Sequence, residues 1–143
     1  MSFWTIGGIT QCAADGDLAG VERLLDGGVT VDFIENGRYN DSPLQVAARG
    51  GHLAVVKLLL SHGANVNHFD NDLFSPVTAA TAARSWAVAE CLAEHGGDFS
   101  RCDATGRCGL DYLKQCRSKA RRAKIEAILD ERAKMPGASK TGG

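Results

Sequence analysis

The chain of 143 residues carries a formal net charge of −1, with 44% hydrophobic residues, 23% charged residues and three prolines. These values are typical of an ordinary one-domain globular protein and disfavour both a disordered chain and a strongly basic nucleic-acid-binding protein. The opening MSFWTIGG has no basic segment followed by a long apolar stretch, and no run approaches the length of about eighteen apolar residues that a membrane span needs. We therefore expect an intracellular protein that is neither exported nor inserted in a membrane.

The charges are distributed unevenly along the chain. Residues 1–100 carry five Lys or Arg against twelve Asp or Glu, whereas residues 101–143 carry eleven against five. The two parts therefore have formal charges of −7 and +6, which sum to the net −1. This asymmetry makes the basic part a candidate contact for anions.

The five cysteines lack the paired spacing of a disulfide framework or a structural zinc site. We expect free thiols in a reducing compartment, at buried or half-buried positions where cysteine acts as a small hydrophobic residue. They are Cys12, Cys91, Cys102, Cys108 and Cys116.

The chain contains related segments. GDLAGVERLLDGGVTVD, residues 16–32, matches GHLAVVKLLLSHGANVN, residues 51–67, without a gap. Self-similarity of this kind is the signature of a repeat architecture.

Residues 42–67, SPLQVAARGGHLAVVKLLLSHGANVN, contain two predicted helices. Ser42-Pro43 joins a preferred capping residue to a proline favoured at the first helical position, and Gly50-Gly51 ends this helix. A second helix runs from about His52 to Gly63, and its valines and leucines make it too apolar to have only one covered face. We therefore predict that neighbouring units cover it on both sides.

The same pattern recurs further along the chain with a fixed period. Ser42-Pro43 returns as Ser75-Pro76, and the same shift carries Leu59 to Leu92. A third step reaches Cys108-Gly109-Leu110, where only the leucine is kept. Helices this short are marginal alone, and one pair cannot bury both faces of its second helix. The sequence therefore predicts an all-α solenoid of stacked helix pairs.

The segment SPLQVAARGGHLAVVKLLLSHGANVN resembles the ankyrin repeat, whose pattern contains T-P-L-H-x-A and a G-H pair before V-V-x-L-L-L-x-x-G-A. The resemblance implies an ankyrin-repeat solenoid of paired antiparallel helices with short projecting turns or β-hairpin fingers. It implies one domain over residues 1–134. Within this domain Arg84 departs from the family pattern, which favours glycine at that position. The expected repeats cover residues 1–32, 37–69, 70–102 and 103–130, and a disordered tail is expected over residues 135–143.

The resemblance also implies the noncovalent binding of another protein on a concave surface made of finger tips and first helices. We expect a monomer that acts as a stand-alone adaptor, inhibitor or assembly subunit. The positions that the family uses for binding correspond here to Arg38, Tyr39, Asp41, Arg49, Phe69, Asn71, Asp72, Phe74, Ala82, Ala83, Thr105, Arg107 and Gln115.

Three aromatic residues on the expected fingers, Tyr39, Phe69 and Phe74, are candidate apolar anchors, because aromatic residues are enriched at the centres of protein interfaces. The alternative is that these rings pack against one another or against the neighbouring finger. Charge selection of the partner would come from Arg49, Asp72 and Arg107.

Asn67 is a candidate site of modification. It follows LLLSHGANV, and the resemblance implies that an asparagine at this position can be hydroxylated. The favoured alternative is a side chain that stabilises the turn by bonding its own backbone.

A second hypothesis for the function rests on the basic run from Lys114 to Lys124, which contains six Lys or Arg and no acid. Such a run suits a nucleic acid or another polyanion. No aromatic residue interleaves with the basic ones, and the chain has no overall positive charge. A solvated helix face is therefore the favoured interpretation.

The sequence contains no pattern typical of catalysis. It has no Gly-rich phosphate loop, no paired-carboxylate motif and no H-E-x-x-H. Cys102, Cys108 and Cys116, with His95 upstream, are spaced too widely for a structural zinc site, and the repeat explains the place of His52. We therefore expect no enzyme activity, no cofactor and no metal.

Overall fold

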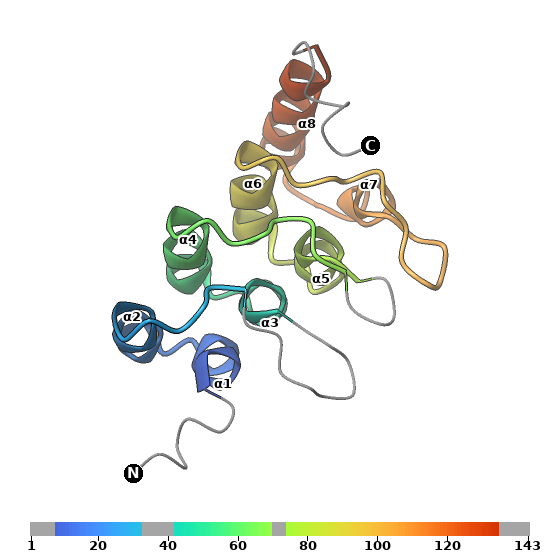
Figure 1. The fold of residues 1–143 in the computed structure, drawn as a ribbon. Helices are drawn as coiled ribbons and strands as arrows, with labels where there is room; N and C mark the ends of the chain where they lie inside the picture. The colour runs from blue at the N-terminus through green and yellow to red at the C-terminus, as the bar shows by residue number, and fades with distance from the viewer. Residues whose placement is uncertain (1–7, 33–41, 70–73, 135–143) are drawn as a thin grey trace.

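The computed structural model describes residues 8–32, 42–69 and 74–134 (Figure 1), and the rest of the chain lies outside the described part. In these ranges the chain is helical apart from turns and one isolated antiparallel bridge between Cys102 and Cys108. The all-α prediction is confirmed. The helices are α1 (Gly8–Asp15), α2 (Leu18–Asp26), α3 (Pro43–Gly50), α4 (Leu53–Ser61), α5 (Pro76–Ala82), α6 (Trp86–Glu94), α7 (Gly109–Leu113) and α8 (Lys119–Lys134).

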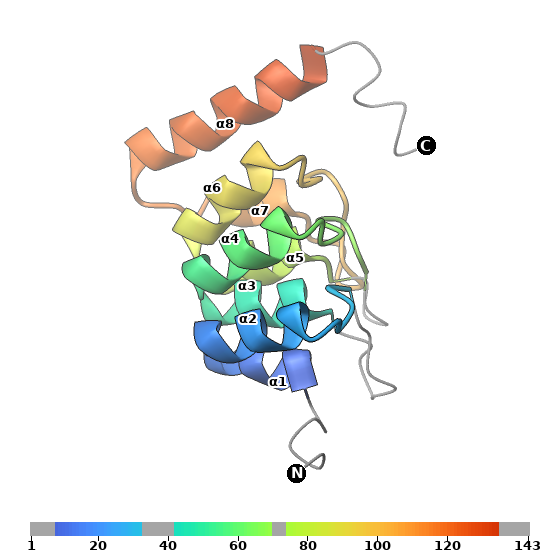
Figure 2. The ribbon, with the colours of Figure 1, turned by 60° about the vertical axis from the view of Figure 1, so that its left-hand side comes forward.

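The helices stack in two columns (Figures 1 and 2). The first helices, α1, α3, α5 and α7, pack in that order against one another, and the second helices, α2, α4, α6 and α8, form the neighbouring column. The two helices also pack together within the pairs α1–α2, α3–α4 and α5–α6. This arrangement is a solenoid, whose stability is a sum of unit and interface contributions.

Serines cap α3 and α5, as predicted. The Ser42 hydroxyl accepts a hydrogen bond from the backbone N–H of Gln45, and Gln45 Oε1 accepts one from the backbone N–H of Ser42, both at 3.2 Å. Ser75 and Thr78 make the same reciprocal exchange at 3.3 and 2.7 Å. Each cap satisfies amides that the first turn leaves unpaired, which is worth about 1 kcal/mol.

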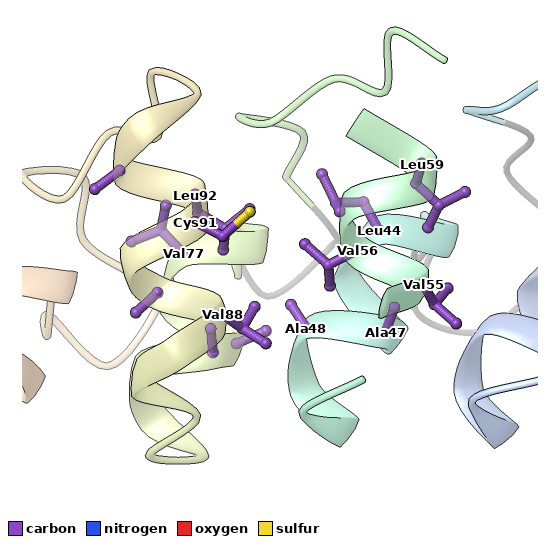
Figure 3. Packing of buried hydrophobic residues seen from close by; sticks show 14 of the residues in the cluster. Leu44, Ala47, Ala48, Val55, Val56, Leu59, Val77, Val88, Cys91 and Leu92 are labelled. Atoms are coloured by element: carbon purple, nitrogen blue, oxygen red, sulfur yellow. The ribbon is translucent and has the colours of Figure 1, made fainter. Parts of the chain in front are cut away.

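Both faces of α4 are covered, as its apolar composition predicted. Val55, Val56 and Leu59 are each no more than 1% exposed. Figure 3 shows Val56 pointing toward the α5–α6 pair, whereas Val55 points away from it. The fully buried Ala47 and Ala48 let α3 approach its neighbours closely. Burial of each Val or Leu side chain stabilises the stack by about 1.5–3 kcal/mol.

Turns with positive φ separate the helices. Gly51 follows α3 with φ 73° and Gly63 follows α4 with φ 83°. Arg84, one period after Gly51, adopts φ 61° and is the only residue other than glycine with positive φ in the described ranges. A side chain in this conformation costs roughly 1–2 kcal/mol, because Cβ crowds the backbone.

Helix α8 differs from the other second helices. It has 16 residues, of which only Ile125 is buried, and it extends at an angle past α6 (Figure 2). Arg132 fastens it to α6, since its Nε donates to the Ala93 carbonyl at 3.0 Å and its Nη2 donates to the Glu94 carbonyl. These contacts place the guanidinium at the C-terminus of α6, where the last carbonyls lack full helical pairing.

Candidate interaction surface

The ends of the first helices form an exposed row. Arg49 lies in the last turn of α3, and Ala82 occupies the equivalent place at the end of α5. One repeat period beyond Ala82 lies Gln115, which follows α7. Its Oε1 accepts a hydrogen bond from Arg84 Nη2 at 3.3 Å. Ala83 is also exposed beside Ala82. Four of the predicted binding residues therefore lie on successive units of one column.

The finger before α7 is organised by Asp103, which is only 4% exposed. Its Oδ1 accepts hydrogen bonds from the backbone N–H groups of Thr105 and Arg107 at 2.9 and 3.2 Å, and its Oδ2 accepts one from the Tyr112 hydroxyl at 3.2 Å. Desolvation opposes ionisation of Asp103, but these hydrogen bonds and one from the Thr105 hydroxyl outweigh it and lower the pKa of the carboxyl.

Thr105 and Arg107 are both exposed at this finger. The Thr105 hydroxyl donates to Asp103, so this exposed side chain also stabilises the turn. The Arg107 side chain projects from a backbone that Asp103 holds in place. Arg107 is therefore the better placed of the two to contact a partner by charge.

Phe69 pairs with a residue of the next unit. The guanidinium of Arg101 lies over the Phe69 ring, 3.8 Å from its centroid, in a cation–π contact. Phe69 is half-buried and Arg101 is exposed. Both interpretations of this aromatic therefore have a physical basis, because the ring packs against the neighbouring unit and remains partly accessible.

Phe74 is half-buried directly before the Ser75 cap of α5. Its carbonyl accepts a hydrogen bond at 2.8 Å from Nε2 of Gln45, which belongs to α3. This bond joins two successive units at the base of the finger. It fixes the backbone of Phe74, which is itself one of the predicted anchors.

The other predicted binding residues belong to two segments that lie outside the described residues, 33–41 and 70–73. Their assignment to the binding surface remains a prediction. They are Arg38, Tyr39, Asp41, Asn71 and Asp72.

A family model for ankyrin repeats, in three copies, matches residues 9–103. The chain belongs to the ankyrin repeat family. No curated protein matches the chain. Ankyrin repeats are generally protein–protein interaction modules and are typically not enzymes. The match ends at the finger before α7, so it does not cover the pair α7–α8.

Histidine and asparagine side chains link the ankyrin units through backbone atoms. His52 Nε2 lies 3.0 Å from the Ala14 carbonyl, which joins the second unit to the first. Asn67 Oδ1 accepts from the backbone N–H of Asp98 at 2.8 Å, and its Nδ2 donates to the Gly96 carbonyl at 3.3 Å. The Asn67 side chain thus stabilises the next unit's turn, rather than its own backbone as the favoured alternative held.

The basic run of the ankyrin chain faces acidic partners. Lys124 Nζ lies 2.6 Å and Arg121 Nε 3.7 Å from carboxylate oxygens of Glu90 on α6. Arg122 also pairs with Glu126 within α8, at 3.9 Å. Glu90, by hydrogen bonding and charge, raises the pKa of Lys124. Two of the six cations, Arg121 and Lys124, therefore attach α8 to α6, which weakens the polyanion hypothesis.

The remaining chemistry-bearing side chains are dispersed. His62 and His95 turn Nδ1 toward carbonyls of their own helices, at 3.0 Å from Leu58 and 2.9 Å from Cys91. The described residues contain no group of three or more His, Cys, Asp or Glu arranged to hold a metal ion. None of the helices within the described ranges is long and apolar enough to cross a membrane.

Sequence reasoning missed three residues that shape this surface or its support, Arg101, Glu90 and Arg132. Arg101 could have been found, because it immediately precedes the position one period after Phe69 and so lies in the adjacent unit. Glu90 and Arg132 carried no such signal. Their contacts depend on how α8 crosses α6, which the repeat pattern does not specify.

Proposed function

We propose that this ankyrin repeat protein binds a protein partner on its finger-side surface and acts as an adaptor, inhibitor or assembly subunit. The finger-side surface is the set of exposed or half-exposed residues at the ends of the first helices and on the fingers. Within the described residues it comprises Arg49, Phe69, Phe74, Ala82, Ala83, Arg101, Thr105, Arg107 and Gln115.

One observation carries the proposal. Arg49 and Ala82 stand at the same place on neighbouring first helices, exposed, while the residues just before them in each helix are buried. The two positions share one place in the repeat register and carry an arginine in one unit and an alanine in the next. The variation suits a surface selected for a ligand, in a family whose members generally bind proteins.

The surface is held rigid before any partner arrives. Gln45 fixes the backbone at Phe74, Asp103 fixes the finger that carries Arg107, and Arg101 covers one face of Phe69. A preformed surface loses little conformational entropy on binding, so more of the contact energy appears as affinity.

The chemical character of the surface indicates the kind of partner. Arg49, Arg101 and Arg107 are exposed cations, and Phe69 supplies a half-buried aromatic ring in contact with Arg101. Arginine and aromatic residues are the commonest hot spots of protein interfaces. We propose a partner surface that presents carboxylates around an apolar centre.

We further propose that residues 103–130 form a fourth ankyrin unit that lengthens this surface. Helix α7 packs against α5, and α8 packs against α6, so the two columns continue beyond the match to the family. Cys108 occupies the capping position one period after Ser75, and its backbone N–H donates to Asp111 Oδ2 at 3.1 Å.

The test uses two variants with the same change of charge. Arg49→Glu with Arg107→Glu alters the finger-side surface, and Lys57→Glu with Arg117→Glu alters exposed residues of α4 and of the α7–α8 connection. Proteins captured from the native lysate by wild type and both variants are identified by mass spectrometry. Each partner is then purified and titrated calorimetrically.

We expect a partner whose affinity falls at least tenfold, about 1.4 kcal/mol, with the finger-side variant and stays unchanged with the control variant. Thermal melts of both variants must match that of wild type. A purified partner that both variants bind as tightly as wild type does would overturn the proposed surface.

A further inference from the structure

Two cysteines face each other at the base of the finger before α7. Cys102 and Cys108 form the antiparallel bridge of this finger. The backbone N–H of Asp103 donates to the Arg107 carbonyl at 2.9 Å, so the hydrogen bond lies one residue inside the cysteine pair. Cys102 and Cys108 are therefore opposite each other in a non-hydrogen-bonded pair, the closer of the two kinds in antiparallel strands.

This spacing suits a disulfide. The Cα atoms of such a pair are about 4.5 Å apart, and disulfides join Cα atoms about 4.4–6.8 Å apart. Desolvation raises the pKa of the Cys102 thiol, and the charge and hydrogen bonding of the Cys108 side chain are the next causes, as is expected for neighbouring thiols. The backbone needs no large movement to bring the two sulfur atoms together.

The repeat itself makes a cysteine at 108 unexpected. The preceding units have Ser42 and Ser75 at this position, where their hydroxyls cap α3 and α5. Cys108 keeps the other half of this capping box, since its backbone N–H donates to Asp111 Oδ2 at 3.1 Å. Its Sγ donates to the same oxygen at 3.4 Å. A thiol is a weaker hydrogen-bonding group than a hydroxyl, so capping alone favours serine here. Compared with serine, a cysteine at position 108 adds the ability to form a disulfide with Cys102.

We propose that Cys102 and Cys108 form a reversible cross-strand disulfide, with a small disulfide such as oxidised glutathione as the oxidant. Cys102 is exposed and reacts through the ionised fraction of its thiol, which its raised pKa keeps small near neutral pH. This thiolate attacks one sulfur of glutathione disulfide and forms a mixed disulfide, releasing one reduced glutathione. The Cys108 thiolate then attacks the Cys102 sulfur, forms the cross-strand bond and releases the second glutathione. Each protein sulfur loses one electron, and the glutathione disulfide gains both.

The bond would change the finger in two ways. It would close the loop that carries Thr105 and Arg107, restricting the motion of the exposed tip. It would also remove the Cys108 thiol hydrogen from Asp111, leaving that carboxylate with the backbone N–H of Cys108 and the exposed ion pair with Lys114. The redox state of the pair is therefore coupled to the end of the finger-side surface.

The sequence permits a direct assay. Trypsin cleaves after Arg101, Arg107 and Lys114, which places Cys102 in CDATGR and Cys108 in CGLDYLK. The purified protein is equilibrated in glutathione redox buffers, the remaining thiols are alkylated after denaturation, and the digest is analysed by mass spectrometry. The two peptides are expected as one cross-linked species that a reductant separates. The oxidised fraction should not change when the protein is diluted.

Serine variants serve as controls. Cys108→Ser restores the residue that caps α3 and α5, so it is expected to fold. In this variant Cys102 should stop at the mixed disulfide with glutathione, and in Cys102→Ser the Cys108 peptide should stay unlinked. The proposal is overturned if wild type also stops at the glutathione adduct, if Cys102 joins two chains, or if Cys108 links to Cys91 or Cys116 instead.

Discussion

The side chain of Asn67 reaches across the boundary between two ankyrin units to bind the backbone of Asp98. Its Oδ1 accepts from the Asp98 N–H at 2.8 Å, and Asp32 makes the equivalent bond to the Asn65 N–H at 2.9 Å. Positions 65 and 98 are one period apart, so the same bond occurs at two successive boundaries. These side chains tie the turns of the first three units together.

Asn67→Ala should lower the free energy of unfolding by about 1–3 kcal/mol, because it leaves a partly buried backbone N–H and carbonyl without their partner. Asn67→Asp keeps the acceptor and should cost less. Urea unfolding followed by circular dichroism measures both. An alanine variant as stable as wild type would show that this bond contributes nothing to the joint between units.

The stability that Asp103 provides should depend on pH. Hydrogen bonds lower the pKa of Asp103 in the folded state, and in the unfolded chain an aspartate titrates near about 3.9. Ionised Asp103 therefore stabilises the fold above about pH 4, and this contribution is lost as the pH falls through the lowered folded pKa.

Asp103→Asn, which cannot ionise, provides the comparison. The difference in unfolding free energy between wild type and this variant should be largest near neutral pH and should shrink as the pH falls below about 4. Urea titrations at several pH values give the difference directly. A difference that stays constant across this range would mean that the carboxylate charge does not hold the finger.

Arg84→Gly should stabilise the protein by up to about 1 kcal/mol. Arg84 adopts φ 61°, a conformation that costs a side chain roughly 1–2 kcal/mol and that glycine adopts freely. The loss of its exposed hydrogen bond to Gln115 and the greater freedom of glycine in the unfolded chain offset part of the gain. Thermal melting of the Arg84→Gly variant shows whether the net change in stability is positive, as we expect, or negative. Gly51→Ala, at the equivalent position with φ 73°, should lower the melting temperature.

Arg132→Met should loosen α8 without unfolding the other helices. Methionine keeps most of the side-chain volume but cannot donate to the carbonyls of Ala93 and Glu94, a loss of about 1.5 kcal/mol or more for bonds to a charged group. Amide hydrogen exchange should become faster along α8 while α3 and α4 keep their protection. Uniform acceleration throughout the stack would instead mean that α8 and the other pairs unfold together.

The sequence was sufficient to predict the stack but only part of its surface. Local signals such as Ser42-Pro43 predict where helices begin, and the alternation of small and branched residues predicts their buried faces. The repeat period places each helix beside its equivalent. Caps, buried faces and turns follow from that register. The same register predicted that Arg49 and Ala82 would share a row of the surface.

The joints between units were harder to predict. The Phe69–Arg101 and Asn67–Asp98 contacts connect residues about one period apart, and the period alone does not specify which side chains meet. The place of α8 depends on ion pairs with Glu90, for which the other units offer no precedent. These contacts depend on three-dimensional packing rather than on local pattern.

Hydrogen exchange of the complex with the captured partner tests the central claim most directly. We expect binding to slow exchange at the end of α3 and in the finger of residues 101–107, with little change along α4. If exchange slows along the second helices instead, while the finger and the end of α3 exchange as in the unbound protein, the partner binds the opposite column and the finger-side surface is not the binding site.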